Sequence, residues 1–157
     1  MTTDPFAALA LPRGGAMRNR FMLAPLTNMQ SHADGTLSDA EIHWLAKRAE
    51  GGFALTMSAA AHVQQIGQGF AGQLGIWSDD HLPGLTRMAA AIRAHGSLSS
   101  VQLHHAGFRT PGELIGGGAP VCPWDDAETG ARALTTAEVE QLIQDFITAG
   151  LRAERAG

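Results

Sequence analysis

The 157-residue sequence contains no tyrosine and one cysteine, Cys122. A single cysteine excludes a disulfide framework and is typical of a reducing compartment, so we expect a cytoplasmic protein. Eleven lysine and arginine residues stand against fifteen acidic ones, which gives a formal net charge of −4 and a pI of about 5.9. This balance argues against the basic surface of a nucleic-acid-binding protein. We therefore expect no nucleic acid as a partner.

Long apolar runs are also missing. The longest is far shorter than the roughly 20 residues that span a bilayer. The N-terminal stretch MTTDPFAALALPRGG has no positively charged segment before its apolar part, as a secretory signal would have. We therefore expect no membrane as a partner. The length suits one domain over residues 1–157, and 45% hydrophobic residues are enough to form a core.

Short apolar segments alternate with amphipathic helical segments along the chain. We predict strands over Phe21–Leu23, Phe53–Met57 and Leu98–Leu103, and helices that begin near Ser38, Trp77 and Thr135. Strands that alternate with helices predict an α/β fold with a parallel sheet. Before them, two apolar segments at 6–11 and 16–21 flank the turn residues 12–15 and predict a hairpin.

The predicted helix starts carry capping signals. Ser38 is followed three residues later by Glu41, and Thr135 by Glu138, which is the spacing of a capping box. The last helix has a continuous apolar face, and we expect its Leu142/Phe146 part to be only partly buried. The face consists of Val139, Leu142, Ile143, Phe146, Ile147 and Leu151.

The stretch FMLAPLTNMQ, residues 21–30, begins as a buried strand and then becomes polar. Proline cannot donate to a sheet ladder, so Pro25 marks the strand end, and the hydroxyl of Thr27 follows it. The other two strands end in the small residues 58–61 and in Gln102-Leu103-His104. The carboxyl ends of parallel strands build the site in α/β folds, so we expect the site at this edge.

Four motifs appear in an order and spacing that resemble the old yellow enzyme family. They are Asn19-Arg20, Ala24-Pro25-Leu26-Thr27, Gly75-Ile76-Trp77-Ser78-Asp79-Asp80-His81 and Val101-Gln102-Leu103-His104-His105-Ala106-Gly107. The resemblance implies an FMN-dependent ene-reductase on a (β/α)₈ TIM barrel. The chain would supply the N-terminal three βα units, with the hairpin plugging the barrel bottom. NAD(P)H would be the reductant and an activated alkene the substrate.

The resemblance also implies roles for six cofactor-binding residues. Ala24, Pro25, Leu26 and Thr27 would lie along the flavin, with the Thr27 hydroxyl near its O4/N5 edge. Ala60 would leave room beside the ring. Gln102 would bond the pyrimidine end, because a carboxamide carries both a donor and an acceptor. From the residues alone, Thr27 could be an ordinary strand-end hydroxyl, Ala60 plain packing and Gln102 a partner for buried backbone.

The family's substrate-anchoring His–His or His–Asn pair and its proton-donating tyrosine lie just after the fourth strand, and its phosphate loops come later. We therefore assign no catalytic residue to this chain. The rest of the barrel would come from a complementing C-terminal chain or a second copy, or be missing. The alternatives are a non-catalytic half-barrel that acts as an assembly partner, or another FMN barrel of the dihydroorotate dehydrogenase kind. The Pro25-Leu26-Thr27 and Gln102 pattern argues against that last alternative.

Histidine is the remaining candidate for chemistry. His104 and His105 are adjacent on a strand and must point to opposite faces, so one could line the site while the other anchors a loop. The other five histidines have no metal-ligand spacing, and we predict no metal site. They are His32, His43, His62, His81 and His95.

Overall fold

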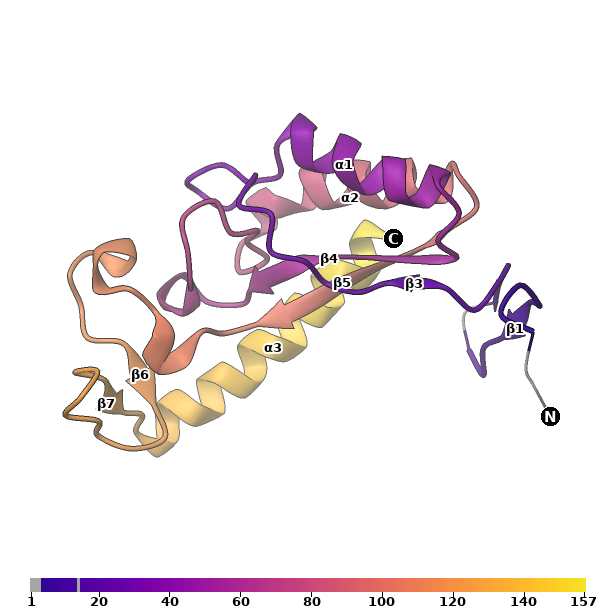
Figure 1. Cartoon of the computed structure of the whole chain (residues 1–157). Coiled ribbons are helices and arrows are strands. Elements are labelled where there is room, and N and C mark those ends of the chain that lie inside the picture. Colours follow the sequence, from indigo (N-terminus) through magenta and orange to yellow (C-terminus); the bar gives the residue numbers. More distant parts are fainter. Residues whose placement is uncertain (1–3, 14) are drawn as a thin grey trace.

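A parallel three-stranded sheet forms the centre of the computed structural model, which describes residues 4–13 and 15–157 (Figure 1). The strands lie in the order β3 (Met22–Leu23), β4 (Leu55–His62) and β5 (Leu98–His104). Each is followed by a helix: α1 (Asp39–Glu50), α2 (Leu82–Arg93) and α3 (Thr136–Ala156). The predicted alternation of strands and helices is confirmed.

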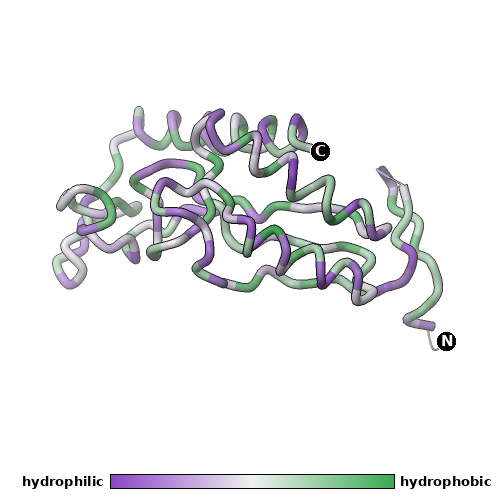
Figure 2. The backbone as a smooth tube through the Cα atoms, turned by 90° about the horizontal axis from the view of Figure 1, so that it is seen from above, coloured by the Kyte–Doolittle hydropathy of each residue, from purple (hydrophilic) through white to green (hydrophobic). Residues whose placement is uncertain are grey.

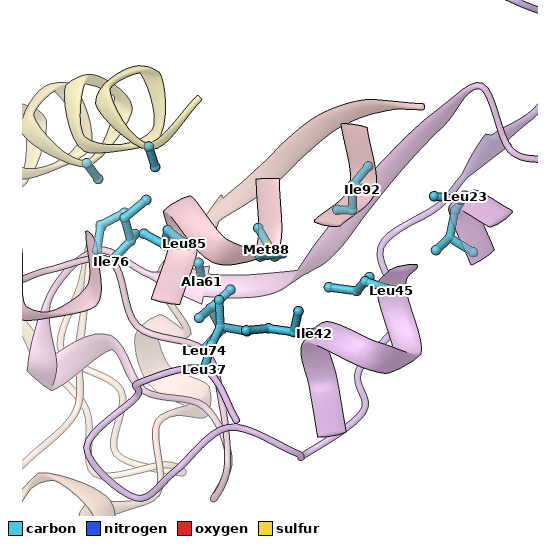
Figure 3. Close-up of a cluster of buried hydrophobic side chains, with 14 residues drawn as sticks. Leu23, Leu37, Ile42, Leu45, Ala61, Leu74, Ile76, Leu85, Met88 and Ile92 are labelled. Atoms are coloured by element: carbon cyan, nitrogen blue, oxygen red, sulfur yellow. The ribbon is translucent and has the colours of Figure 1, made fainter. Parts of the chain in front are cut away.

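The helices cover one face of this sheet. Helices α1 and α2 pack side by side above it, and α3 runs along β5 (Figure 1). Hydrophobic and hydrophilic positions alternate along the helices, as amphipathic helices require (Figure 2). The core lies between helices and sheet, where Leu45 of α1 and Ile92 of α2 are fully buried and Leu23 of β3 joins them (Figure 3).

The opposite face of the sheet is open. Leu23 and Ala61 belong to the core beneath the helices, so strand alternation turns Met22 and Ala60 the other way. Met22 is 43% exposed. Strands β3 and β5 each pair only with β4 among the described residues, and each therefore has a free edge. In the described residues the sheet is therefore open on one face and at both edges.

The predicted hairpin is confirmed in shortened form. Strands β1 (Leu9–Ala10) and β2 (Ala16–Met17) pair antiparallel, while Gly14 of the predicted turn lies outside the described residues. Side chains that follow the hairpin bind the end of α1. The Arg18 Nη2 donates to Ala49 O at 2.8 Å, and the Asn19 Nδ2 donates to Gly52 O at 2.9 Å. The hairpin thus lies at the amino end of the parallel strands (Figure 1).

Strand β4 runs further than predicted. It continues to His62, so residues 58–61, expected beyond the strand, lie inside it. A bulge between Met57 and Ala60 interrupts its pairing with β5. Alanine and serine have low β-propensity, so these residues did not predict a strand. Their small side chains nevertheless fit beneath the helices, where Ala61 is fully buried.

The long connection between β5 and α3 has more structure than predicted. It contains two short 3-10 helices, Gly107–Arg109 and Gly112–Ile115. It also contains a parallel pair of two-residue strands, β6 (Val121–Cys122) and β7 (Arg132–Ala133). Strands this short carry no periodic sequence signal.

Helix α3 begins as predicted, with a reciprocal capping box between Thr135 and Glu138. The expected partial burial of its apolar face is confirmed. Leu142 and Phe146 pack against the core as half-buried residues. Four other residues form an exposed apolar stripe along the helix: Val139, Ile143, Ile147 and Leu151. In the described part of the chain, no helix is long and apolar enough to cross a membrane.

Candidate cofactor site

The carboxyl ends of β3, β4 and β5 lie at one end of the sheet, together with the loops that leave them (Figure 1). All six residues predicted to bind a cofactor lie on these strands or directly after them. Ala24, Pro25, Leu26 and Thr27 continue the line of β3, Ala60 lies on β4 and Gln102 on β5.

Ala60 and Gln102 are register partners on neighbouring strands. Both are half-buried and belong to the open face of the sheet. The Gln102 carboxamide makes no hydrogen bond to any described residue, so it does not serve as a partner for buried backbone. The backbone N–H of Gln102 donates to Ser58 Oγ at 3.4 Å beside the bulge. The amide therefore presents a free donor and a free acceptor beside a small side chain.

Residues 24–27 form an extended, accessible segment. Leu26 is 53% exposed, Pro25 is half-buried, and Ala24 and Thr27 are exposed. Within residues 4–13 and 15–157 the Thr27 hydroxyl has no hydrogen-bond partner. The structure thus brings Ala60 and Gln102 into contact and places the 24–27 segment at the end of the adjoining strand.

Glu41 contributes to this region in a way the sequence did not indicate. Its side chain is fully buried at the start of α1. One carboxyl oxygen accepts from Asn28 Nδ2 at 3.0 Å and the other from Ser31 Oγ at 2.5 Å. Half of the predicted capping box is present, since the backbone N–H of Glu41 donates to Ser38 Oγ at 3.1 Å. The reciprocal bond, from the Ser38 backbone N–H to the Glu41 carboxyl group, was predicted wrongly, because both carboxyl oxygens bind the loop after β3.

The role of Gln73 was not predicted from the sequence either. This residue is fully buried in the loop after β4. Its Nε2 donates to Ala60 O at 3.1 Å, and its Oε1 accepts from Gly69 N at 2.6 Å. Gln73 therefore links this loop to the backbone of Ala60, the register partner of Gln102. A glutamine in a loop rich in glycine and glutamine carries no sequence signal for such a role.

The adjacent histidines have different surroundings. His104 Nδ1 lies 3.2 Å from Gln73 Nε2. His105 lies 3.2 Å from Gln64 Oε1 through its Nε2, and its Nδ1 accepts from Gly107 N at 3.0 Å. Burial lowers the pKa of both imidazoles, and the nearby His104 lowers the pKa of His105 further. His105 is therefore a loop anchor, as one sequence-based alternative proposed.

The loops after β3 and β4 meet backbone to backbone. Ser31 N donates to Gly72 O at 3.1 Å. Gly72 has φ of +72°, and a Cβ there would come within 2.6 Å of Met29 O, so only glycine fits. A cleft of about 540 Å³ opens beside this contact, lined in part by Met29, Gln68, Glu113 and Leu114.

Comparison with known proteins identifies the family. Residues 11–157 match the NADH:flavin oxidoreductase / NADH oxidase family, and the chain belongs to it. It is 37% identical over 155 residues to the probable NADH-dependent flavin oxidoreductase YqiG of Bacillus subtilis (strain 168), covering 97% of this chain and 41% of that protein. It is 35% identical over 152 residues to the NADH:fumarate oxidoreductase of Klebsiella pneumoniae (strain 342), covering 94% of this chain and 16% of that one.

Solved structures of old yellow enzyme homologues have the same fold over this part of the chain. The old yellow enzyme homologue from Zymomonas mobilis superposes with a TM-score of 0.89 at 27% identity, covering 99% of this chain and 46% of that one. Morphinone reductase in complex with tetrahydroNAD gives 0.88 at 25% identity, with 99% and 47% coverage. The predicted resemblance to old yellow enzymes and the partial-barrel fold are confirmed. The chain spans less than half the length of each of these four proteins.

Proposed function

We propose that this chain forms the flavin-facing N-terminal part of an FMN-dependent oxidoreductase that uses NAD(P)H to reduce activated C=C bonds. The observation that carries the proposal is the placement of Ala60 and Gln102 as register partners, next to the free segment 24–27. Membership of the NADH:flavin oxidoreductase / NADH oxidase family, and similarity to an NADH-dependent flavin oxidoreductase, support the NAD(P)H and flavin dependence of this activity. The single cysteine supports a cytoplasmic location.

The residues present fit a planar cofactor with a polar edge. Gln102 offers an unengaged donor and acceptor, which matches a flavin pyrimidine edge. The methyl side chain of Ala60 leaves space for a ring to approach the sheet. The accessible Thr27 hydroxyl can donate near the O4/N5 edge of the ring. When bound, FMN would supply the chemistry of accepting a hydride from NAD(P)H and delivering it to the alkene.

The chain's own residues would bind and orient the ring and adjust its electronics. Gln102 would satisfy the pyrimidine groups, which are costly to bury unpaired. Thr27 would stabilise negative charge that accumulates at the flavin edge on reduction. The proton for the alkene would come from outside this chain, which has no tyrosine.

The remainder of the barrel would complete the site. The free edges of β3 and β5 and the apolar stripe on α3 are surfaces that further βα units would cover. We propose a complementing C-terminal barrel part, or a second copy, as the partner. It would also supply the phosphate loops, which in phosphate-binding barrels usually follow strands seven and eight.

The test is spectroscopic. The assembled protein should be yellow, and anaerobic addition of NADH or NADPH should bleach the flavin bands, with reoxidation by an enone. The non-catalytic alternative, a half-barrel that serves only in assembly, is favoured by the exposed stripe on α3. A colourless assembly that binds no added FMN would support that alternative and reject the oxidoreductase.

A further inference from the structure

We infer that Glu41 is a positioning residue for the flavin-contacting segment 24–27. This inference rests on the proposed function, because it concerns how the chain holds that segment against the cofactor. Glu41 would not touch the flavin itself. It would act through Asn28, which follows Thr27 directly in the chain.

The geometry of Glu41 carries the inference. The side chain is fully buried, and both carboxyl oxygens accept hydrogen bonds from the loop after β3, one from Asn28 and one from Ser31. A buried carboxyl group is costly unless its hydrogen bonds are made. The two bonds therefore fix the distance between the first turn of α1 and the loop.

Little else holds this loop. Among the described residues, the bond from Asn28 to Glu41 is the one hydrogen bond that ties residues 26–30 to another element. The remaining bond within that stretch is local, from Gln30 N to Asn28 Oδ1 at 3.1 Å. The next tie is Ser31 N to Gly72 O. The loop lies beyond the carboxyl end of β3 and leads into α1 (Figure 1). The position of the Thr27 hydroxyl thus depends on an anchor one residue away.

The alternative is that Glu41 only stabilises the fold. Two matched variants separate the roles. Glu41→Leu keeps the apolar packing and removes both bonds, whereas Glu41→Gln can retain them, because the Ser31 hydroxyl can also accept. Thr56→Val is the control: it removes the buried bond of Thr56 Oγ1 to Ser97 Oγ, 2.9 Å, at the amino end of the strands. Asn28→Ala removes the bond to Glu41 together with the local bond from Gln30 N, and serves if Glu41→Leu does not fold.

The experiment measures the midpoint potential of bound FMN in the assembled holoenzyme for each variant, alone and combined with Thr27→Ala. We expect Glu41→Leu and Asn28→Ala to lower the potential in the same direction as Thr27→Ala and to add nothing in the double variants. Coupled residues are non-additive in this way, while independent ones add. Glu41→Gln should restore the parental potential, and Thr56→Val should not change it.

A second readout does not depend on the cofactor. Amide hydrogen exchange over residues 26–31 should be faster in Glu41→Leu than in the parent and in Thr56→Val. An unchanged exchange rate, an unchanged potential or an additive double variant would each overturn the role of Glu41. If the parent protein shows the expected amide hydrogen exchange but binds no FMN, the proposed function is rejected instead, and the flavin-positioning role of Glu41 with it.

Discussion

Ala60 on β4 and Gln102 on β5 stand side by side as register partners, while Ala61, the next residue, faces the buried core. One alanine therefore borders the open face of the sheet and its neighbour packs beneath the helices. The same substitution at the two positions should have opposite consequences.

We predict that Ala60→Leu abolishes FMN binding with little effect on stability, since the added atoms occupy the space proposed for the ring. Ala61→Leu should instead destabilise the fold by about 1–3 kcal/mol through overpacking of a fully buried site. FMN titration and urea unfolding of both variants check this. Similar effects of the two substitutions on FMN affinity would contradict the placement of Ala60.

Gln102→Leu should weaken FMN binding by about 1–3 kcal/mol, because flavin polar groups would be buried without a partner. The matched control is Ser100→Ala, two residues earlier on β5 and on the same face. The measurement is the FMN dissociation constant by fluorescence quenching. Equal affinity in Gln102→Leu and the parent would remove Gln102 from the site.

Thr27→Ala, made in the assembled holoenzyme, should retain FMN but lower the flavin potential and slow its reduction by NAD(P)H. The lost bond is one that strengthens as negative charge accumulates, and such charge-linked bonds contribute about 1.5–3 kcal/mol. Thr148→Ala, on the exposed part of α3, is the control. An unchanged midpoint potential together with an unchanged reductive rate would refute the role of Thr27.

The sequence predicted the order of the strands and helices, but not how the segments after the strands are held in place. Capping signals are local, so Thr135 with Glu138 was predictable from spacing alone. Ser38 and Glu41 have the same spacing, yet the Glu41 carboxyl binds Asn28 and Ser31, thirteen and ten residues away. That choice depends on how α1 packs over the loop. The place of Gln73 beneath Ala60 likewise depends on tertiary packing.

Acid should destabilise the protein between about pH 7 and 5, through the buried histidines. Burial lowers the pKa of His62 below its ordinary value of 6.5, and also that of His104 and His105. The unfolded chain therefore binds more protons as the pH falls through 6.5, and the free energy of unfolding decreases. His62→Asn should flatten this slope in urea unfolding measured from pH 8 to 5. A slope as steep as the parent's would show that His62 does not contribute.

The last prediction concerns residues 1–157 expressed alone, which should be neither a stable monomer nor an active enzyme. Within the part of the chain that the structure describes, strands β3 and β5 each leave one edge without a ladder partner, and such edges invite aggregation. The apolar stripe on α3 adds exposed surface, with Ile143, Ile147 and Leu151 each more than half exposed. We therefore expect self-association in light scattering after size exclusion, and FMN binding far weaker than in the assembled barrel.

Two further measurements sharpen that test. Ile143→Lys combined with Leu151→Lys should reduce self-association of the isolated chain, because the stripe is interrupted while the half-buried Leu142 and Phe146 keep their packing. The same pair should impair assembly with a complementing C-terminal barrel part, since that part would cover the stripe. A monodisperse monomer of residues 1–157 that binds FMN tightly and reduces an enone with NAD(P)H would contradict the need for the rest of the barrel. It would also contradict the proposal that the proton donor comes from the rest of the barrel.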